Sequence, residues 1–225
     1  MGMAAQWAMI TAILMHIDHL LTLTQWLSPA YPIGAFAWSH GLERAVQRGD
    51  VEGAQGLQDW LVDVLTHGAG RTDAILLCVA HGADDVTEVA ALAAVLAPSQ
   101  ERRMETMQQG AAFAATTRAV WHLDLPDMAY PVAVGRAVGL MGVPAAQTAQ
   151  VWLQCFASNL VQAAQRLMPL GQTEGQRILA ALAPICRDIG MQAAHSDLGA
   201  IGSSTLAVDI ASMQHETQSP RIFRS

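Results

Sequence analysis

The chain has 225 residues, of which 52% are hydrophobic and only 14% are charged, and its formal net charge is -7 at pH 7. This length fits one domain with a sizeable core, and the low charged fraction indicates surface that is buried internally or against a partner. The acidic balance argues against a nucleic-acid partner, because phosphate binding needs a concentrated basic face. All 12 basic residues are arginine, so the lysines of P-loop and Schiff-base sites are absent. Any nucleotide chemistry must therefore belong to another protein.

Residues 1–16 read as a possible N-terminal extension, with Met15 as an alternative start. The apolar run there lacks the basic beginning of a signal peptide, is interrupted by His16 and Asp18, and is too short to span a bilayer. No later segment predicts a transmembrane helix. Three widely spaced cysteines predict reduced core thiols. We therefore expect a cytoplasmic protein with no membrane association.

Helical periodicity dominates residues 17–208, which we expect to form the main domain. An apolar stripe at helical spacing begins at Leu57 and ends at Leu65. Further helices are expected after a cap at Asp84 or Asp85, from Ser99 to about Trp121, from Pro131 to before Gly142, from Ala145 to Met168, and from a Thr173–Gln176 capping pair to about Ile189, kinked at Pro184. No run of alternating residues predicts a strand. The fold class is thus all-α: a single-domain bundle of about eight to ten helices.

The character of the chain changes after Leu198. A connection rich in glycine and serine leads into residues 209–225, which read as a flexible C-terminal tail that is disordered when alone. His215 and Glu216 stand in this tail, where no core is expected to need them, so recognition of a partner is favoured for them.

Ser39 and His40 raise the possibility of an enzyme. The stretch Ala37-Trp38-Ser39-His40-Gly41 is similar to a loosened GxSxG elbow, the turn that exposes the nucleophilic serine of many hydrolases. Such an elbow needs a strand before it, and the chain offers none. A helical hydrolase using Ser39 and His40 is kept as an alternative, and no catalytic residue is assigned.

A cluster near the start raises a metal alternative. His16, Asp18 and His19 carry ligand types that suit nickel or zinc, and His215 could join them in a protein that binds nickel directly. A partly exposed first helix explains the cluster equally well. His40 and Glu43 are three residues apart, but two ligands seldom make a site. No resident metal site is predicted.

Three segments taken together resemble the UreF family of urease accessory proteins. They are LLTLTQWLSPAYPIGAFAWSHGLERAV at residues 20–46, NLVQAAQRLMPLGQTEGQRIL at 159–179, and AVDIASMQHETQSPRIFRS at 207–225. Their order and spacing carry the resemblance across nearly the whole chain. Trp38 and His40 depart from the family pattern, in which tyrosine and glutamine are more usual.

The resemblance implies an all-helical, homodimeric, non-catalytic assembly factor for urease. Such proteins bind a scaffold, UreH (also called UreD), and recruit the GTPase UreG, and the complex delivers nickel to apo-urease. No cofactor would be bound permanently, since nickel is handled by the complex. Passage of nickel through this chain, and activation or restraint of the GTPase, stay open at this point.

The resemblance also assigns two sets of site residues. The scaffold-binding tail would use Phe223 as an apolar anchor and arginines as carboxylate contacts, the whole set being Asp209, His215, Glu216, Thr217, Arg221, Phe223 and Arg224. The dimer or GTPase-docking motif would comprise Pro32, Gly34, Phe36, Ser39, Gly41, Leu42 and Glu43. Because ordering a chain costs about 1 to 2 kcal/mol per residue, the tail is expected to fold only on its partner.

Overall fold

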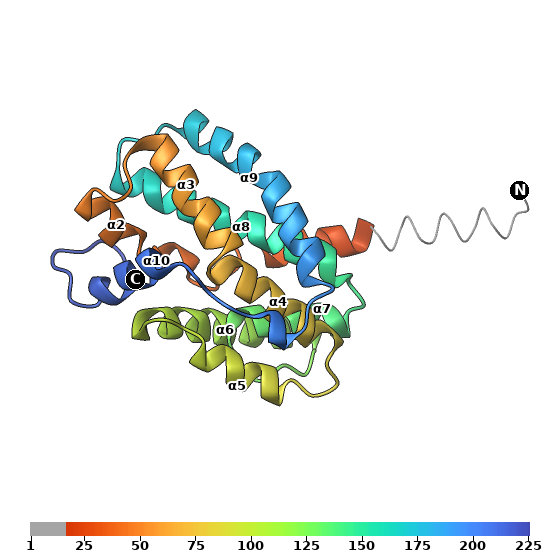
Figure 1. The fold of residues 1–225 in the computed structure, drawn as a ribbon. Helices are drawn as coiled ribbons and strands as arrows, with labels where there is room; N and C mark the ends of the chain where they lie inside the picture. The colour runs from red at the N-terminus through yellow and green to blue at the C-terminus, as the bar shows by residue number, and fades with distance from the viewer. Residues whose placement is uncertain (1–16) are drawn as a thin grey trace, which may run out of the picture.

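The computed structural model describes residues 17–225, and in this part of the chain it contains helices and no strand. A helix over 17–26 is followed by η1 (Ala35–Ala37), α2 (Leu42–Arg48), α3 (Gly53–Thr66), α4 (Ala69–Gly82), α5 (Thr87–Val95), α6 (Gln100–Trp121), α7 (Tyr130–Leu140), α8 (Ala145–Leu167), α9 (Gln172–Ala193), η2 (Leu198–Ala200) and α10 (Leu206–His215). The prediction of an all-α bundle of eight to ten helices is confirmed (Figure 1).

Helix α4 forms the centre of the bundle. It packs along α7 and also contacts α3, α8 and α9, while α8 packs along α9 (Figure 1). Four of its neighbours therefore cover it, and its residues from Ala74 to Leu77 are all buried. A helix that is apolar on nearly every side is stable only in such a position. The largest fully buried side chain, Trp26, packs edge-on against Phe113 and Trp121 of α6.

Most helix starts are those the sequence predicts. Ser99 caps α6, since its hydroxyl accepts the Arg102 N–H, and Asp85 accepts the Thr87 N–H at the start of α5. The capping pair proposed for Thr173 and Gln176 is wrong. Helix α9 begins one residue earlier, and the Glu174 carboxylate accepts the Gly171 N–H at 3.0 Å. The acidic side chain at the third helical position therefore performs the capping.

The C-terminal segment differs from the flexible tail expected of residues 209–225. Helix α10 begins at Leu206, before the expected boundary, and lies beside α2 (Figure 1). His215, Phe223 and Ser225 are buried against the body of the same chain. The segment is ordered because the body supplies partners for its polar groups, as described below.

Close helix crossings provide a test of the packing. A Cβ atom added at Gly135 of α7 would lie 2.2 Å from the Leu77 carbonyl oxygen of α4, whereas one added at Gly82 would meet nothing within 4 Å. Gly135→Ala should lower the free energy of unfolding by about 2 to 3 kcal/mol, because backbone must move to relieve the clash. Urea unfolding checks this. Gly82→Ala is the matched control and should change the free energy of unfolding by less than ~1 kcal/mol. Equal effects of the two changes would contradict the close contact between α7 and α4 at Gly135.

Candidate functional site

The N-terminal motif, the start of α6 and the C-terminal segment meet in one polar cluster, which is buried except at Arg221. We call it the terminal junction and define it as Ser39, Glu43, Glu101, Glu105, His215, Arg221 and Ser225. Its partners are far apart in sequence: 172 residues separate His215 from Glu43, and 114 separate it from Glu101. Figure 1 shows α10 and the C-terminus beside α2, at the opposite end of the molecule from the helix over 17–26.

His215 lies at the centre of the terminal junction and is fully buried. Its Nε2 is 3.1 Å from Glu43 Oε2, and its Nδ1 is 2.7 Å from Glu101 Oε2. Both contacts are complete hydrogen bonds only when both ring nitrogens carry a proton. Arg221 adds a guanidinium, with Nη1 2.6 Å from Glu101 Oε1. Two carboxylates and two basic side chains are thus paired in a cluster that is buried at His215 and reaches solvent at Arg221.

Glu43 also holds the backbone of the C-terminal segment. Its Oε1 accepts the Ile222 N–H at 2.7 Å, and its Oε2 accepts the Phe223 N–H at 2.8 Å. With the His215 contact, one carboxylate receives three hydrogen bonds from the last eleven residues. A buried carboxylate is tolerated only when it is satisfied in this way. Glu43 is therefore the receptor for the C-terminal segment.

Ser39 and Glu105 hold the end of the segment. The Ser39 N–H donates to the Ser225 backbone oxygen at 2.7 Å, and the Ser39 hydroxyl donates to the same oxygen. The Ser225 hydroxyl donates to Glu105 Oε2 at 3.2 Å. All three residues are buried. The serine that was a candidate nucleophile is thus a contact for the C-terminal segment.

Gly41 lets the two chain ends approach. Its φ of +76° lies in the left-handed region, and an added Cβ would lie 2.8 Å from the Ser212 nitrogen of α10. Only glycine combines this conformation with such a close approach. The Gly41 that the resemblance placed in the docking motif therefore seats α10 against the start of α2.

A further buried polar cluster adjoins the terminal junction, formed by Asp73 of α4 and by Arg102 and Glu105 of α6. Arg102 pairs with Glu105, and its Nη2 is 4.0 Å from Asp73 Oδ2. The Arg102 Nε is buried without a hydrogen-bond partner. Loss of hydration raises the pKa of Asp73 to about 7, although the charge of Arg102 acts in the opposite direction. This cluster connects the core to Glu105 and hence to Ser225.

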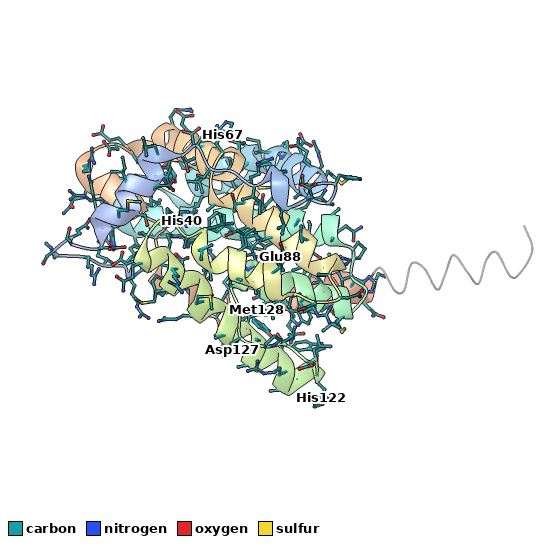
Figure 2. The ribbon with its side chains drawn as sticks, turned by 60° about the horizontal axis from the view of Figure 1, so that its bottom comes forward. His40, His67, Glu88, His122, Asp127 and Met128 are labelled. Atoms are coloured by element: carbon teal, nitrogen blue, oxygen red, sulfur yellow. The ribbon has the colours of Figure 1, made fainter. Side chains whose placement is uncertain are left out.

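His40 is not paired with Ser39 in a catalytic arrangement. Its Nδ1 is buried without a partner, its ring packs edge-on against Phe156, and burial holds the pKa of the imidazole well below its usual range. The histidines do not gather either: Figure 2 shows His40 inside the body, His122 at the tip of α6 and His67 at the opposite edge. Across residues 17–225, no group of three or more His, Cys, Asp or Glu side chains is arranged to hold a metal ion.

The structure brings together members of both predicted residue sets. Ser39, Gly41 and Glu43 contact the segment that contains His215 and Arg221. The tail residues expected to contact a scaffold are thus partly engaged inside the chain: Arg221 pairs with Glu101, and Phe223 is buried. His215 also has a core role, contrary to expectation.

Other predicted residues lie apart from the terminal junction. Phe36 is 51% exposed, Leu42 belongs to the apolar core, and His16 lies outside the described residues. Sequence reasoning missed Glu101, Glu105, Arg102 and Asp73. Glu101 gave only a partial cue, because an acidic residue in the first turn of a helix usually complements the helix dipole at the surface.

Removing one charge from Glu43 tests the terminal junction. Glu43→Gln should lower the free energy of unfolding by about 2 to 3 kcal/mol, because the amide cannot accept from His215 and from both backbone N–H groups. Hydrogen exchange should quicken selectively at Ile222 and Phe223. Glu88→Gln, on the exposed start of α5 (Figure 2), is the matched control and should leave both quantities unchanged. Unaltered protection at Ile222 would show that Glu43 does not hold the segment.

The raised pKa of Asp73 predicts a pH dependence of stability. The carboxyl titrates near 3.8 ordinarily and near 7 when folded, so between these values the folded state holds a proton that the unfolded chain has lost. The free energy of unfolding therefore falls as pH rises through this window. Asp73→Asn should remove on the order of 2 kcal/mol of the fall between pH 5 and pH 8, measured by urea unfolding. Asp188→Asn, at an exposed position, is the control and should show the wild-type dependence of the unfolding free energy on pH. If Asp73→Asn shows that same dependence, Asp73 is not the group responsible for the fall.

Comparison with known proteins gives the family. The sequence model of the UreF family matches residues 51–183, which is more than half of the chain. Among similar proteins, one from Roseobacter denitrificans is 48% identical over 215 residues, covering 95% of this chain and 97% of the relative. One from Cereibacter sphaeroides strain KD131 is 53% identical over 206 residues, covering 92% and 98% respectively. Both carry the name urease accessory protein UreF. On these matches, and with an all-helical fold, the chain belongs to the UreF family.

Proposed function

We propose that the chain is a non-catalytic accessory subunit of urease maturation. It docks on a UreH-type scaffold, recruits the nickel-carrying GTPase UreG, and so assists nickel insertion into apo-urease. The names of its relatives support the role in urease maturation. The finer steps, and a homodimeric state, rest on the family resemblance and on the surface described next.

The proposal that the chain docks on a scaffold is based on the outer face of α10. Leu206, Ile210 and Met213 follow at i, i+4 and i+7 on one face, and Leu206 is 70% and Met213 49% exposed. The opposite face, with Ala211 and His215, is buried. An apolar stripe that a helix turns away from its own core is typical of a surface that a partner covers.

The terminal junction gives this surface a fixed orientation. Because Gly41 seats α10 against α2 and the carboxylates of Glu43 and Glu101 hold His215, the apolar stripe must face outward. A helix held in its binding geometry loses less conformational entropy on association than a free tail. Docking by a preformed helix therefore replaces the expected folding of a disordered tail onto the scaffold.

The hydrolase alternative receives little support from the geometry. The Ser39 hydroxyl donates to the Ser225 backbone oxygen, and His40 lies with its Nδ1 unpaired beside Phe156. A nucleophilic serine needs a base within hydrogen-bond reach and a third group that orients the base. We assign Ser39 to structure, and nickel to the complex as its cargo. None of the described helices is long and apolar enough to cross a membrane.

A charge placed in the α10 stripe tests scaffold docking. Ile210→Asp should abolish or weaken by at least about tenfold the complex formed with a co-expressed UreH-type scaffold, because a carboxylate would be buried without a partner. Light scattering after size exclusion measures the complex, and urease activity with bound nickel measures maturation in cells that lack the native chain. Both should fall together.

Val95→Asp is the matched control, since Val95 is 73% exposed at the end of α5, outside the stripe. It should leave the complex and the maturation of urease unchanged. An intact complex with Ile210→Asp, in a protein of unchanged thermal stability, would remove α10 from the interface. GTP hydrolysis by the isolated chain, persisting after every trace of a GTPase is removed, would overturn the non-catalytic assignment.

A further inference from the structure

A second surface, away from the α10 stripe, combines arginine with aromatic rings. We call it the arginine–aromatic patch and define it as the exposed Phe36, Arg166 and Arg224 together with the buried rings of Trp38 and Phe223 beneath the two arginines. Phe36 is 51% exposed, and within residues 17–225 it is the one phenylalanine, tyrosine or tryptophan side chain with such exposure. Aromatic and arginine side chains together are the residues that dominate binding energy at protein interfaces.

Arg166 of α8 is held in place but left without an acidic partner. Its guanidinium lies over the Phe223 ring, 4.3 Å from the ring centroid, and its Nη1 donates to the Phe36 backbone oxygen at 2.8 Å. No carboxylate of residues 17–225 lies within ion-pair distance of it. The ring and the carbonyl fix the planar group while its remaining N–H donors stay available.

Arg224 is also held against an aromatic ring, that of Trp38. Its guanidinium lies 4.7 Å from the Trp38 ring centroid, and its backbone N–H donates to the Ala37 oxygen at 2.8 Å. Its side-chain partner is the sulfur of Met104, at 3.7 Å, and not a carboxylate. Two arginines are thus positioned by rings, within a protein of net charge -7.

A groove beside the patch adds polar groups that suit a peptide backbone. It has a volume of about 420 Å³, and Phe36, Trp38 and Phe223 line it together with Arg166. Its remaining polar lining consists of side-chain amides and one hydroxyl, from Ser158, Asn159, Gln162, Gln165, Gln172 and Gln176, and includes no carboxylate. Amide side chains both donate and accept hydrogen bonds, as peptide groups do.

We propose that this groove binds an extended, acidic segment of a partner protein. One carboxylate of the segment pairs with Arg166 in the groove, another with Arg224, which lies over Trp38 at the side of the groove, and the backbone pairs with the amides of α8 and α9. The inference rests on the proposed function, in that the partner is a component of urease maturation. Charge complementarity selects the occupant, because the Arg166 guanidinium lines a groove that has no carboxylate in its lining, and it attracts carboxylates and repels basic segments. Phe36 would cover an apolar side chain of the segment.

Two peptides test the proposal on the isolated protein. One is a fluorescein-labelled octapeptide that alternates leucine with glutamate, and the other replaces each glutamate with glutamine. Fluorescence anisotropy should show the glutamate peptide binding at least about tenfold more tightly, with affinity that falls as salt rises. Arg166→Gln should reduce its affinity about tenfold, and Arg166→Lys should restore only part of it, since lysine lacks the planar fork. Equal binding of the two peptides would overturn the proposal.

Controls separate the groove from folding and from scaffold docking. Arg187→Gln, which removes an exposed arginine paired with Asp188, should bind the peptide as the wild type does. If Arg166→Gln unfolds, Phe36→Ala replaces it, because this exposed ring can be removed without a core cavity and should still cost several-fold in affinity. Ile210→Asp should bind the peptide normally, so failure of the scaffold complex and failure of the groove are distinguishable.

A second copy of the chain is the competing occupant. Sedimentation equilibrium of the wild type and of Arg166→Gln decides this case. A dimer that Arg166→Gln dissociates, and that the glutamate peptide does not compete with, would overturn the acidic-segment proposal and assign the groove to self-association. An unchanged oligomeric state together with peptide binding lost in Arg166→Gln supports the proposal.

Discussion

The carboxylate of Glu43 is the interaction on which the arrangement of the chain ends depends. Because this carboxylate is buried, the protein must supply its hydrogen bonds. They come from the C-terminal segment: from the His215 ring and from two successive backbone N–H groups. Without the segment, the carboxylate would lose three hydrogen bonds. The body of the protein is thus built to hold its own C-terminus.

Both proposed surfaces follow from this contact. Holding His215 orients α10 and turns Leu206 outward, and holding the Phe223 backbone places the ring beneath Arg166. The α10 stripe and two members of the arginine–aromatic patch, Phe223 and Arg224, therefore belong to one continuous segment, residues 206–225. Neither surface would have a defined shape if that segment were mobile, because binding energy would first have to order it.

The sequence predicted the structural features that depend on residues close together along the chain. It missed the contacts between residues that are distant in the sequence. Stripes such as the one ending at Leu65, and the cap at Ser99, are local, and the structure has them where they were expected. The terminal junction joins residues more than 100 positions apart, so no periodicity records it. Glu101 looks like an ordinary acidic residue in a first helical turn. The tail was expected to be disordered because its polar residues have no visible partner until the fold brings the carboxylates to them.

The polar groups of the terminal junction contribute more to the exact placement of the C-terminal segment than to the stability of the fold. Apolar residues of similar size would often stabilise such a site as well, but they would allow the segment to slide or rotate. Hydrogen bonds to Ile222 and Phe223 fix one register, and a shift by one residue would place the wrong side chain under Arg166. Because both surfaces use that register, a partner that moved the segment at α10 would also change the groove at Phe36. If both proposed surfaces bind their partners, the two binding free energies are linked through residues 216–225, with no change needed in the helical body.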